Sequence, residues 1–90
     1  MNILEIGGGF GSLARIIINN TGSKYFLIDL PEANLLSNYY LQCHFPKKKI
    51  FNYKNFIETG IKDEIDKFDI FILPPHVLEK IELSFNFVIN

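Results

Sequence analysis

Short apolar runs recur along the chain and are separated by polar or mixed stretches. Runs of this length that are rich in β-branched and aromatic residues are typical of buried strands when turn residues bound them. The pattern predicts five strands, at residues 2–6, 24–28, 48–53, 69–73 and 85–89.

The stretch after the first strand has apolar residues at helical spacing. We expect a helix over residues 12–20, with Leu13, Ile16 and Ile17 on its buried face and Gly22 ending it. Residues 55–67 are charged and contain Gly60, so they predict a short helix followed by a loop. Residues 77–81 predict one or two helical turns.

A second long helix is expected over residues 31–43, because Pro31 suits a first helical turn and Pro46 follows the end of the pattern. Its apolar residues lie three or four positions apart, which places them along one stripe. This stripe predicts a buried face made of Ala33, Leu36, Tyr40 and Cys43.

Strands that alternate with helices predict a parallel sheet, so the expected fold is a Rossmann-like α/β domain. The 90 residues allow one domain at most, and 48% of them are apolar, which is ample for a packed core. A sheet of four or five strands leaves an uncovered edge and uncovered faces. We therefore expect the chain to be a fragment of a larger enzyme, truncated after four or five strands.

The most informative segment joins the first strand to the first helix, and it contains four glycines, at positions 7, 8, 9 and 11. Gly7, Gly9 and Gly11 occupy alternate positions, where a side chain would forbid the turn or fill the space of a ligand. Because Ser12 begins a helix, the loop also presents free backbone N–H groups and a positive helix terminus. We expect a nucleotide-like ligand here; the alternative is a tight turn with no ligand.

The second candidate position is Asp29, which ends the second strand about 20 residues beyond the glycines, where dinucleotide folds place an acid on the ribose. A carboxylate can accept hydrogen bonds from both ribose hydroxyls. The alternative is a helix N-terminal acid ahead of Pro31, and the two roles are compatible.

The spacing of the glycines separates two cofactor classes. The dinucleotide fingerprint is G-x-G-x-x-G, and Ser12 stands where its third glycine belongs. The spacing present is G-x-G-x-G, preceded by Glu5. It resembles motif I of the class I S-adenosylmethionine-dependent methyltransferases, and a nicotinamide dinucleotide domain remains the alternative.

The chain resembles in particular the sugar O-methyltransferases. The resemblance rests on residues 4–15 (LEIGGGFGSLAR), 26–32 (FLIDLPE), 72–75 (ILPP) and 84–90 (SFNFVIN). The family usually has aspartate where this chain has Asn86, and its sequences continue past the position of Asn90 toward the methyl acceptor. By this resemblance, residues 1–90 are a partial S-adenosylmethionine-binding methyltransferase domain.

The resemblance implies S-adenosylmethionine as the cofactor and a small-molecule acceptor, a sugar hydroxyl, as the substrate. In this family the glycine loop wraps the amino acid end of the cofactor, with Glu5 near its ammonium. Asp29 would hold the ribose and Leu30 would pack beside the adenosine. The implied cofactor-binding residues are Glu5, Gly7, Gly8, Gly9, Phe10, Gly11, Asp29 and Leu30. No catalytic residue is assigned, so full activity is not expected from this chain alone, and a non-catalytic remnant is the further alternative.

The remaining chemistry-bearing residues give weaker signals. Leu73-Pro74-Pro75-His76 is similar to the D/N-P-P-Y/F loop of amino-group methyltransferases, but it lacks the polar first residue and the aromatic last one. His76 is the better placed of two histidines for a general base, whereas His44 suits a helix end. Cys43 is expected in the core, and no cluster has metal-ligand spacing.

Composition and charge limit the classes of partner that we expect for this chain. The formal charge of −1 gives no electrostatic reason to expect nucleic acid or an anionic membrane. The single cysteine excludes an internal disulfide and fits a reducing compartment, and no apolar run approaches the roughly 20 residues of a membrane span. The expected location is therefore cytoplasmic, and the sequence does not indicate an oligomeric state.

Overall fold

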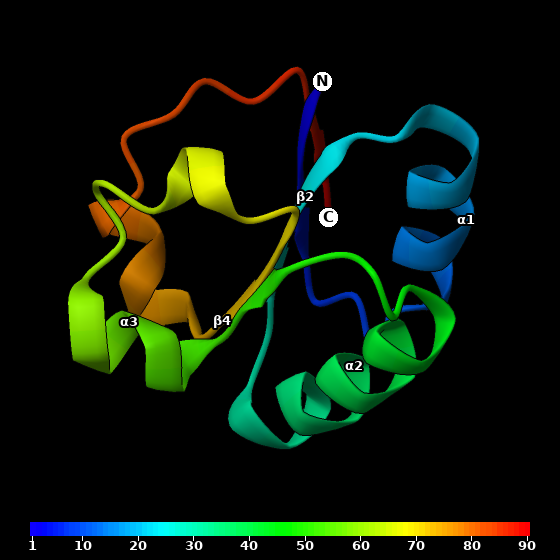
Figure 1. The fold of residues 1–90 in the computed structure, drawn as a ribbon, viewed down its shortest axis with the longest axis horizontal. Helices are drawn as coiled ribbons and strands as arrows, with labels where there is room; N and C mark the ends of the chain where they lie inside the picture. The colour runs from blue at the N-terminus through cyan, green and yellow to red at the C-terminus, as the bar shows by residue number, and fades with distance from the viewer.

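A computed structural model describes all of residues 1–90. It has ten elements, and one or two helical segments separate each strand from the next (Figure 1). In chain order they are β1 (Asn2–Ile6), α1 (Ser12–Thr21), β2 (Lys24–Ile28), α2 (Pro31–His44), β3 (Ile50–Phe51), α3 (Tyr53–Thr59), the 3₁₀ helix η1 (Ile65–Lys67), β4 (Ile70–Leu73), the 3₁₀ helix η2 (Pro75–Lys80) and β5 (Phe87–Ile89).

The five strands form one sheet in the order β3-β4-β2-β1-β5, and every neighbouring pair is parallel. In β1 and β2, Asn2 lies opposite Lys24 and Ile6 lies opposite Ile28. The predicted Rossmann-like α/β fold is confirmed. All the strands end at the same edge of the sheet, the lower edge in Figure 1, so their following loops gather there.

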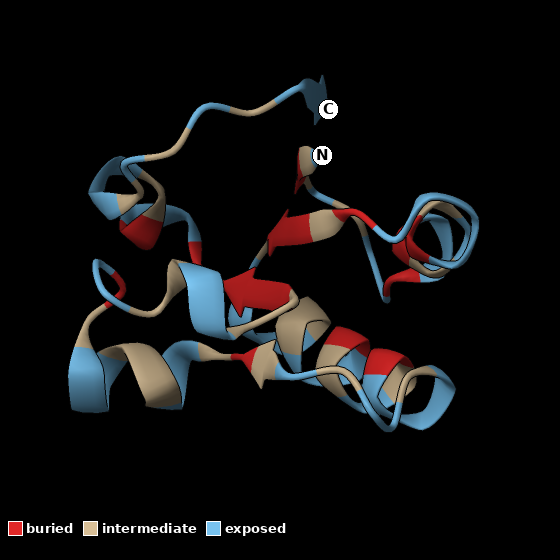
Figure 2. Cartoon of the chain, turned by 45° about the horizontal axis from the view of Figure 1, so that its top comes forward, coloured by how far each residue is buried: buried red, intermediate tan, exposed pale blue.

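Each face of the sheet carries its own apolar core (Figure 2). On one face, Ala14 and Ile18 of α1 and Leu41 of α2 pack with Tyr25 and Leu27 of β2. On the other face, α3, η1, η2 and the segment before β5 cover the alternate residues of the strands, including Phe26, Phe51 and Phe71. The rings of Phe26 and Phe71 stack with their centroids 4.3 Å apart.

The division between the faces follows the direction in which the chain crosses the sheet. From β1 through β2 to β3 it moves toward one edge, and α1 and α2 lie on one face. From β3 through β4 to β5 it moves back, and α3, η1 and η2 lie on the other face. Connections between parallel strands keep the same handedness, so helices change to the other face of the sheet when the chain reverses its direction across the sheet. Neighbouring strands β2 and β4 therefore send their outgoing loops to opposite faces.

The structure corrects the predicted bounds of some elements. Strand β3 has only two residues, where residues 48–53 were expected, because α3 already begins at Tyr53. Asn52 caps α3: its side chain accepts from the Asn55 backbone N–H, and the Asn55 side chain accepts from the Asn52 N–H. This capping box ends the extended backbone early. Strand β5 begins at Phe87, two residues later than predicted.

The predicted buried faces of the two long helices are only partly right: Ile17 and Tyr40 pack against the core, but the fully buried residues are neighbouring ones. In α1 the buried residues are Ala14 and Ile18, while Ile16 is 51% exposed. In α2 the buried residues are Ser37 and Leu41, and Leu36 is 61% exposed. The small side chains of Ala14 and Ser37 lie where the two helices come nearest to the sheet and the glycine loop. Larger apolar residues lie on either side of these positions.

The prediction that Cys43 belongs to the core is also wrong, because the same rotation of α2 leaves this cysteine exposed. None of the helices combines the length and the apolar composition that crossing a bilayer requires.

Candidate functional site

The candidate site lies at the edge of the sheet where the strands end. The glycine loop leaves β1 there, Asp29 and Leu30 follow β2, and Pro74 and Pro75 follow β4. Because the loops after β2 and β4 depart to opposite faces, a crevice opens between them. Open α/β sheets bind ligands in such a crevice.

The glycine loop has the backbone that its sequence predicts. Gly7, Gly9 and Gly11 have φ of 77°, 66° and 100°, a region that other residues rarely adopt. A Cβ added to Gly7 or Gly9 would meet no atom within 4 Å, so these two glycines border open space. A Cβ on Gly11 would lie 3.2 Å from Cγ of Leu41, so Gly11 lets α2 approach the start of α1.

Gly8 serves packing instead. A Cβ at this position would lie 2.4 Å from Cδ1 of Leu27 and 2.7 Å from Cδ of Glu5, closer than side chains come to one another. The loop therefore lies directly on β1 and β2 at Gly8, whereas the positions that a Cβ would take on Gly7 and Gly9 face open space.

Asp29 is in contact with this loop. Its Oδ2 accepts a hydrogen bond from the backbone N–H of Gly9 at 3.2 Å, and its Oδ1 accepts from the N–H of Leu30 at 2.7 Å. The two positions are 20 residues apart in the sequence, and the fold brings them together as predicted for one site. Each carboxylate oxygen has two acceptor positions, so one on each oxygen stays free.

Two side chains of α2 hold the loop and the end of β2 in place. The hydroxyl of Ser37, which is fully buried, donates to the carbonyl oxygen of Gly9 at 2.8 Å. The Nδ2 of Asn34 donates to the carbonyl oxygen of Asp29 at 2.8 Å. Sequence reasoning missed both residues, because it placed apolar residues on this face of α2. Their spacing of three positions was the only available signal.

Glu5 points into the core beneath the loop. It is 6% exposed, and its Oε1 accepts a hydrogen bond from the hydroxyl of Tyr25 at 2.6 Å. Burial of the phenol, and then the hydrogen bond and the negative charge of Glu5, raise the pKa of Tyr25 well above its ordinary value. No protein group donates to Oε2, the oxygen near Gly8.

The other two predicted positions lie on the surface of the site. Leu30 is 60% exposed and borders the cavity described next. Phe10, at the tip of the loop, packs edge-on against Tyr40 with ring centroids 5.1 Å apart. Tyr39 and Tyr40 of α2 do not line the cavity.

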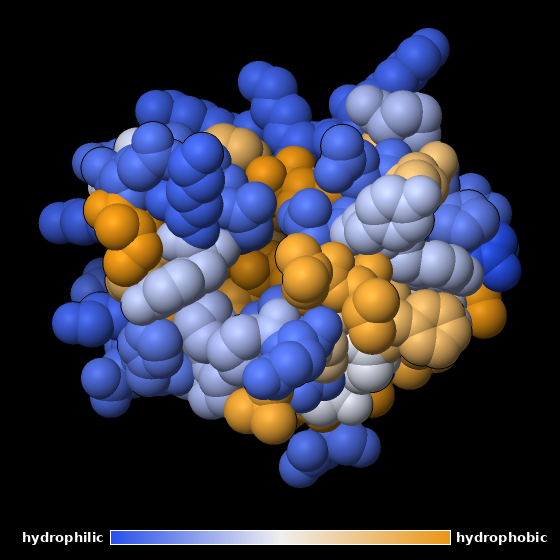
Figure 3. All heavy atoms as spheres, turned by 90° about the horizontal axis from the view of Figure 1, so that it is seen from below, coloured by the Kyte–Doolittle hydropathy of each residue, from blue (hydrophilic) through white to orange (hydrophobic).

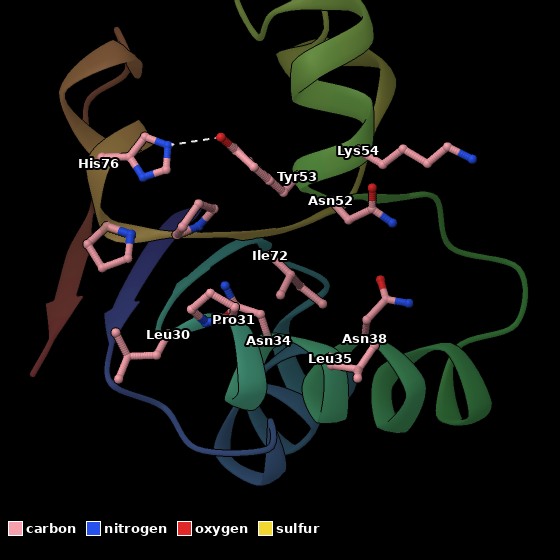
Figure 4. Close-up of a pocket in the computed structure, with 12 residues that line it drawn as sticks. Leu30, Pro31, Asn34, Leu35, Asn38, Asn52, Tyr53, Lys54, Ile72 and His76 are labelled. Atoms are coloured by element: carbon pink, nitrogen blue, oxygen red, sulfur yellow. Dashed lines mark hydrogen bonds between the residues drawn. The ribbon is translucent and has the colours of Figure 1, made fainter.

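A cavity of about 500 Å³ opens beside Leu30, between α2 on one face and the starts of α3 and η2 on the other (Figure 4). Leucine, isoleucine and proline form its apolar walls: Leu30, Pro31, Leu35, Ile72, Pro74 and Pro75. The view from below shows apolar surface running into a hollow with polar residues around it (Figure 3). The volume of the cavity is typical of sites that bind small molecules.

Polar groups lie at the rim and on the α2 wall of this cavity. Nε2 of His76 lies 3.2 Å from the hydroxyl of Tyr53 across its mouth (Figure 4). Asn34, Asn38 and Lys54 also line it. His44, the other histidine, ends α2 outside the cavity and packs on Tyr40. His, Cys, Asp and Glu side chains form no group of three that could hold a metal ion.

No protein-family model, curated protein or solved structure matches the chain. The geometry therefore supplies the structural evidence on function: a glycine loop and an acid in contact at the carboxyl edge of a parallel sheet, next to an apolar cavity.

Proposed function

We propose that this chain is the S-adenosylmethionine-binding portion of a methyltransferase that acts on a sugar hydroxyl. The proposal combines the G-x-G-x-G spacing after Glu5 with the geometry of the corner that this loop forms. The cofactor's sulfonium would supply an electrophilic methyl group. The chain's own residues would bind and orient the cofactor, and no residue is assigned to the acceptor or to removal of its proton.

The observation that carries the proposal is the contact between Asp29 and Gly9. It brings a carboxylate with free acceptor positions to a loop whose glycines border open space. A ribose held by Asp29 would lie at the switch between the two faces of the sheet, as nucleosides do in open α/β folds.

The cavity beside Leu30 supports a nucleoside ligand. Leu30 directly follows Asp29 and borders the cavity, so a base attached to a ribose on Asp29 can extend past Leu30 between apolar walls. The leucine and proline side chains of the lining offer apolar contacts to the faces of an aromatic ring. The free volume of about 500 Å³ accommodates it without rearrangement of the walls.

In this proposal Glu5 acts from beneath the loop. Oε1 is held by Tyr25, which fixes the direction of the carboxylate, and Oε2 retains its acceptor capacity near Gly8. A negative charge there favours an ammonium group lying over the loop, with water between them. The residues around it would bind the amino acid end of the cofactor through backbone N–H groups.

Calorimetric titration with S-adenosylmethionine and S-adenosylhomocysteine tests the proposal. We expect saturable binding by the folded chain and a loss of at least about tenfold in affinity for Asp29→Asn, since the substitution removes the negative charge and one of the two acceptor oxygens. Asp63→Asn, which alters an exposed acid outside the site, is the matched control.

A parallel titration with NADH, followed by its fluorescence, separates the dinucleotide alternative. Stronger binding of NADH than of S-adenosylhomocysteine would reassign the site to that class. Absence of binding by well-folded protein, or equal affinities for the Asp29→Asn and Asp63→Asn variants, would refute the proposal.

A further inference from the structure

Asn38 lies on α2 at the junction of two neighbouring cavities. It lines the cavity of about 500 Å³ beside Leu30 and also a smaller one of about 290 Å³. Its side-chain oxygen is buried and has no hydrogen-bond partner, and its Nδ2 donates to no protein group. A buried amide oxygen without a partner is unusual, because buried polar groups are normally paired.

The other two asparagines of the large cavity use side-chain groups within the fold, although the Oδ1 of Asn34 is also buried without a partner. Nδ2 of Asn34 donates to the Asp29 carbonyl oxygen. Asn52 uses its side chain in the capping box of α3. The side chain of Asn38 makes no such hydrogen bond, although it lies one helical turn from Asn34 on the same side of α2. Figure 4 shows its side chain directed toward the space between α2 and Asn52.

We propose that Asn38 is a specificity-determining residue that recognises the 6-amino edge of a purine in the large cavity. This inference rests on the proposed nucleoside site. A carboxamide presents one donor and one acceptor side by side, and this pair matches N7 and the 6-amino group of adenine. The amide can turn by 180° about its last bond without changing its shape, so either atom can face the ring.

The composition of the lining favours an adenine over a guanine ring. Guanine is recognised by arginine or lysine at O6 and N7, and by carboxylates at its N–H groups. No carboxylate and no arginine lines the large cavity, and its one lysine, Lys54, is exposed at the rim. Apart from Lys54 and His76, the lining consists of asparagine, tyrosine and apolar side chains, which suit a neutral ring carrying an amino group.

The test compares S-adenosylhomocysteine with S-inosylhomocysteine, which differs by an oxygen in place of the 6-amino group. The wild-type chain is expected to bind the adenosyl compound at least about tenfold more tightly, since a bidentate pair contributes about that discrimination. In Asn38→Leu the two affinities should become equal within about twofold. Gln42→Leu changes an exposed amide one turn further along α2 and should keep the wild-type discrimination.

The outcomes separate this inference from the proposed function. Binding of both compounds without discrimination, or discrimination that survives in Asn38→Leu, overturns the role of Asn38 and leaves the cofactor proposal standing. Failure of the folded wild-type chain to bind either compound overturns both. Should Asn38→Leu not fold, Asn38→Ala gives the same comparison, because alanine is the most favourable helix residue.

Discussion

The hydroxyl of Ser37 lies 2.8 Å from the carbonyl oxygen of Gly9 and fastens helix α2 to the glycine loop. The same peptide segment donates its N–H at Gly9 to Asp29. The loop is thus held on both sides, by a helix and by the end of a neighbouring strand. Its conformation is established by the fold before any ligand binds.

Replacing Ser37 by alanine should remove the hydrogen bond between α2 and the glycine loop. A buried hydrogen bond contributes about 0.5–1.5 kcal/mol, so we expect the free energy of unfolding to fall by about that amount and cofactor affinity to fall several-fold. Urea denaturation and calorimetry measure the two effects. Ser84→Ala changes an exposed serine whose side chain makes no hydrogen bond, and should be neutral; equal behaviour of the two variants would contradict the role of Ser37.

Gly8→Ala should destabilise the fold through a clash. The added methyl would lie 2.4 Å from Cδ1 of Leu27 and must displace the side chains beneath the loop, at a cost of about 1–3 kcal/mol. Gly9→Ala meets no neighbour and costs only the strain of a left-handed backbone, about 1–2 kcal/mol.

The two glycine variants are expected to differ in what they impair. Gly8→Ala should mainly lower the urea midpoint. Gly9→Ala should weaken ligand binding more than its loss of stability explains, because the added methyl group occupies the open side of the loop. A wild-type urea midpoint for Gly8→Ala would show that the loop does not lie on β1 and β2 as described.

The pair formed by Tyr25 and Glu5 predicts a loss of stability in alkaline solution. In the folded chain the pKa of Tyr25 is raised by burial and by Glu5, whereas in the unfolded chain it is about 10. The folded state therefore holds its proton more tightly, and the free energy of unfolding should decrease as the pH rises above about 10.

Urea denaturation of the wild type and of Tyr25→Phe tests this dependence. Near neutral pH the variant should be less stable by about 1–3 kcal/mol, because Glu5 loses its donor inside the core. The difference should shrink toward about pH 11, where the wild type loses the contribution of Tyr25. Tyr39→Phe, at a tyrosine that is 72% exposed, should follow the wild type at every pH. A constant gap between wild type and Tyr25→Phe would contradict the assignment.

The central strands and the glycine loop could be predicted from the sequence because their signals are local. Strand β2 has its predicted bounds, since a continuous apolar run between polar ends can be buried on both faces of a parallel sheet. Positive φ at Gly7, Gly9 and Gly11 also follows from their alternate positions in a turn between a strand and a helix. The proximity of Asp29 to this loop follows from the parallel order of β1 and β2.

The details that depend on tertiary contacts could not be predicted in this way. The rotation of α2 is set by the close approach of Ser37 to Gly9 and of Leu41 to Gly11, and apolar periodicity favoured the neighbouring positions instead. The cavity is formed by three segments that meet only in the fold, and the unpaired amide of Asn38 has no sequence signature.

The most direct measurement is a titration of the ¹⁵N-labelled chain with S-adenosylhomocysteine, followed by the amide signals in two-dimensional NMR spectra. Binding at the proposed corner predicts that the signals of Gly7, Gly9, Asp29 and Leu30 shift together and saturate, while those of Lys62 and Asp63, in the exposed segment after α3, stay unchanged. A folded chain whose spectrum does not respond to the ligand, or responds only away from the glycine loop and Asp29, would contradict the account.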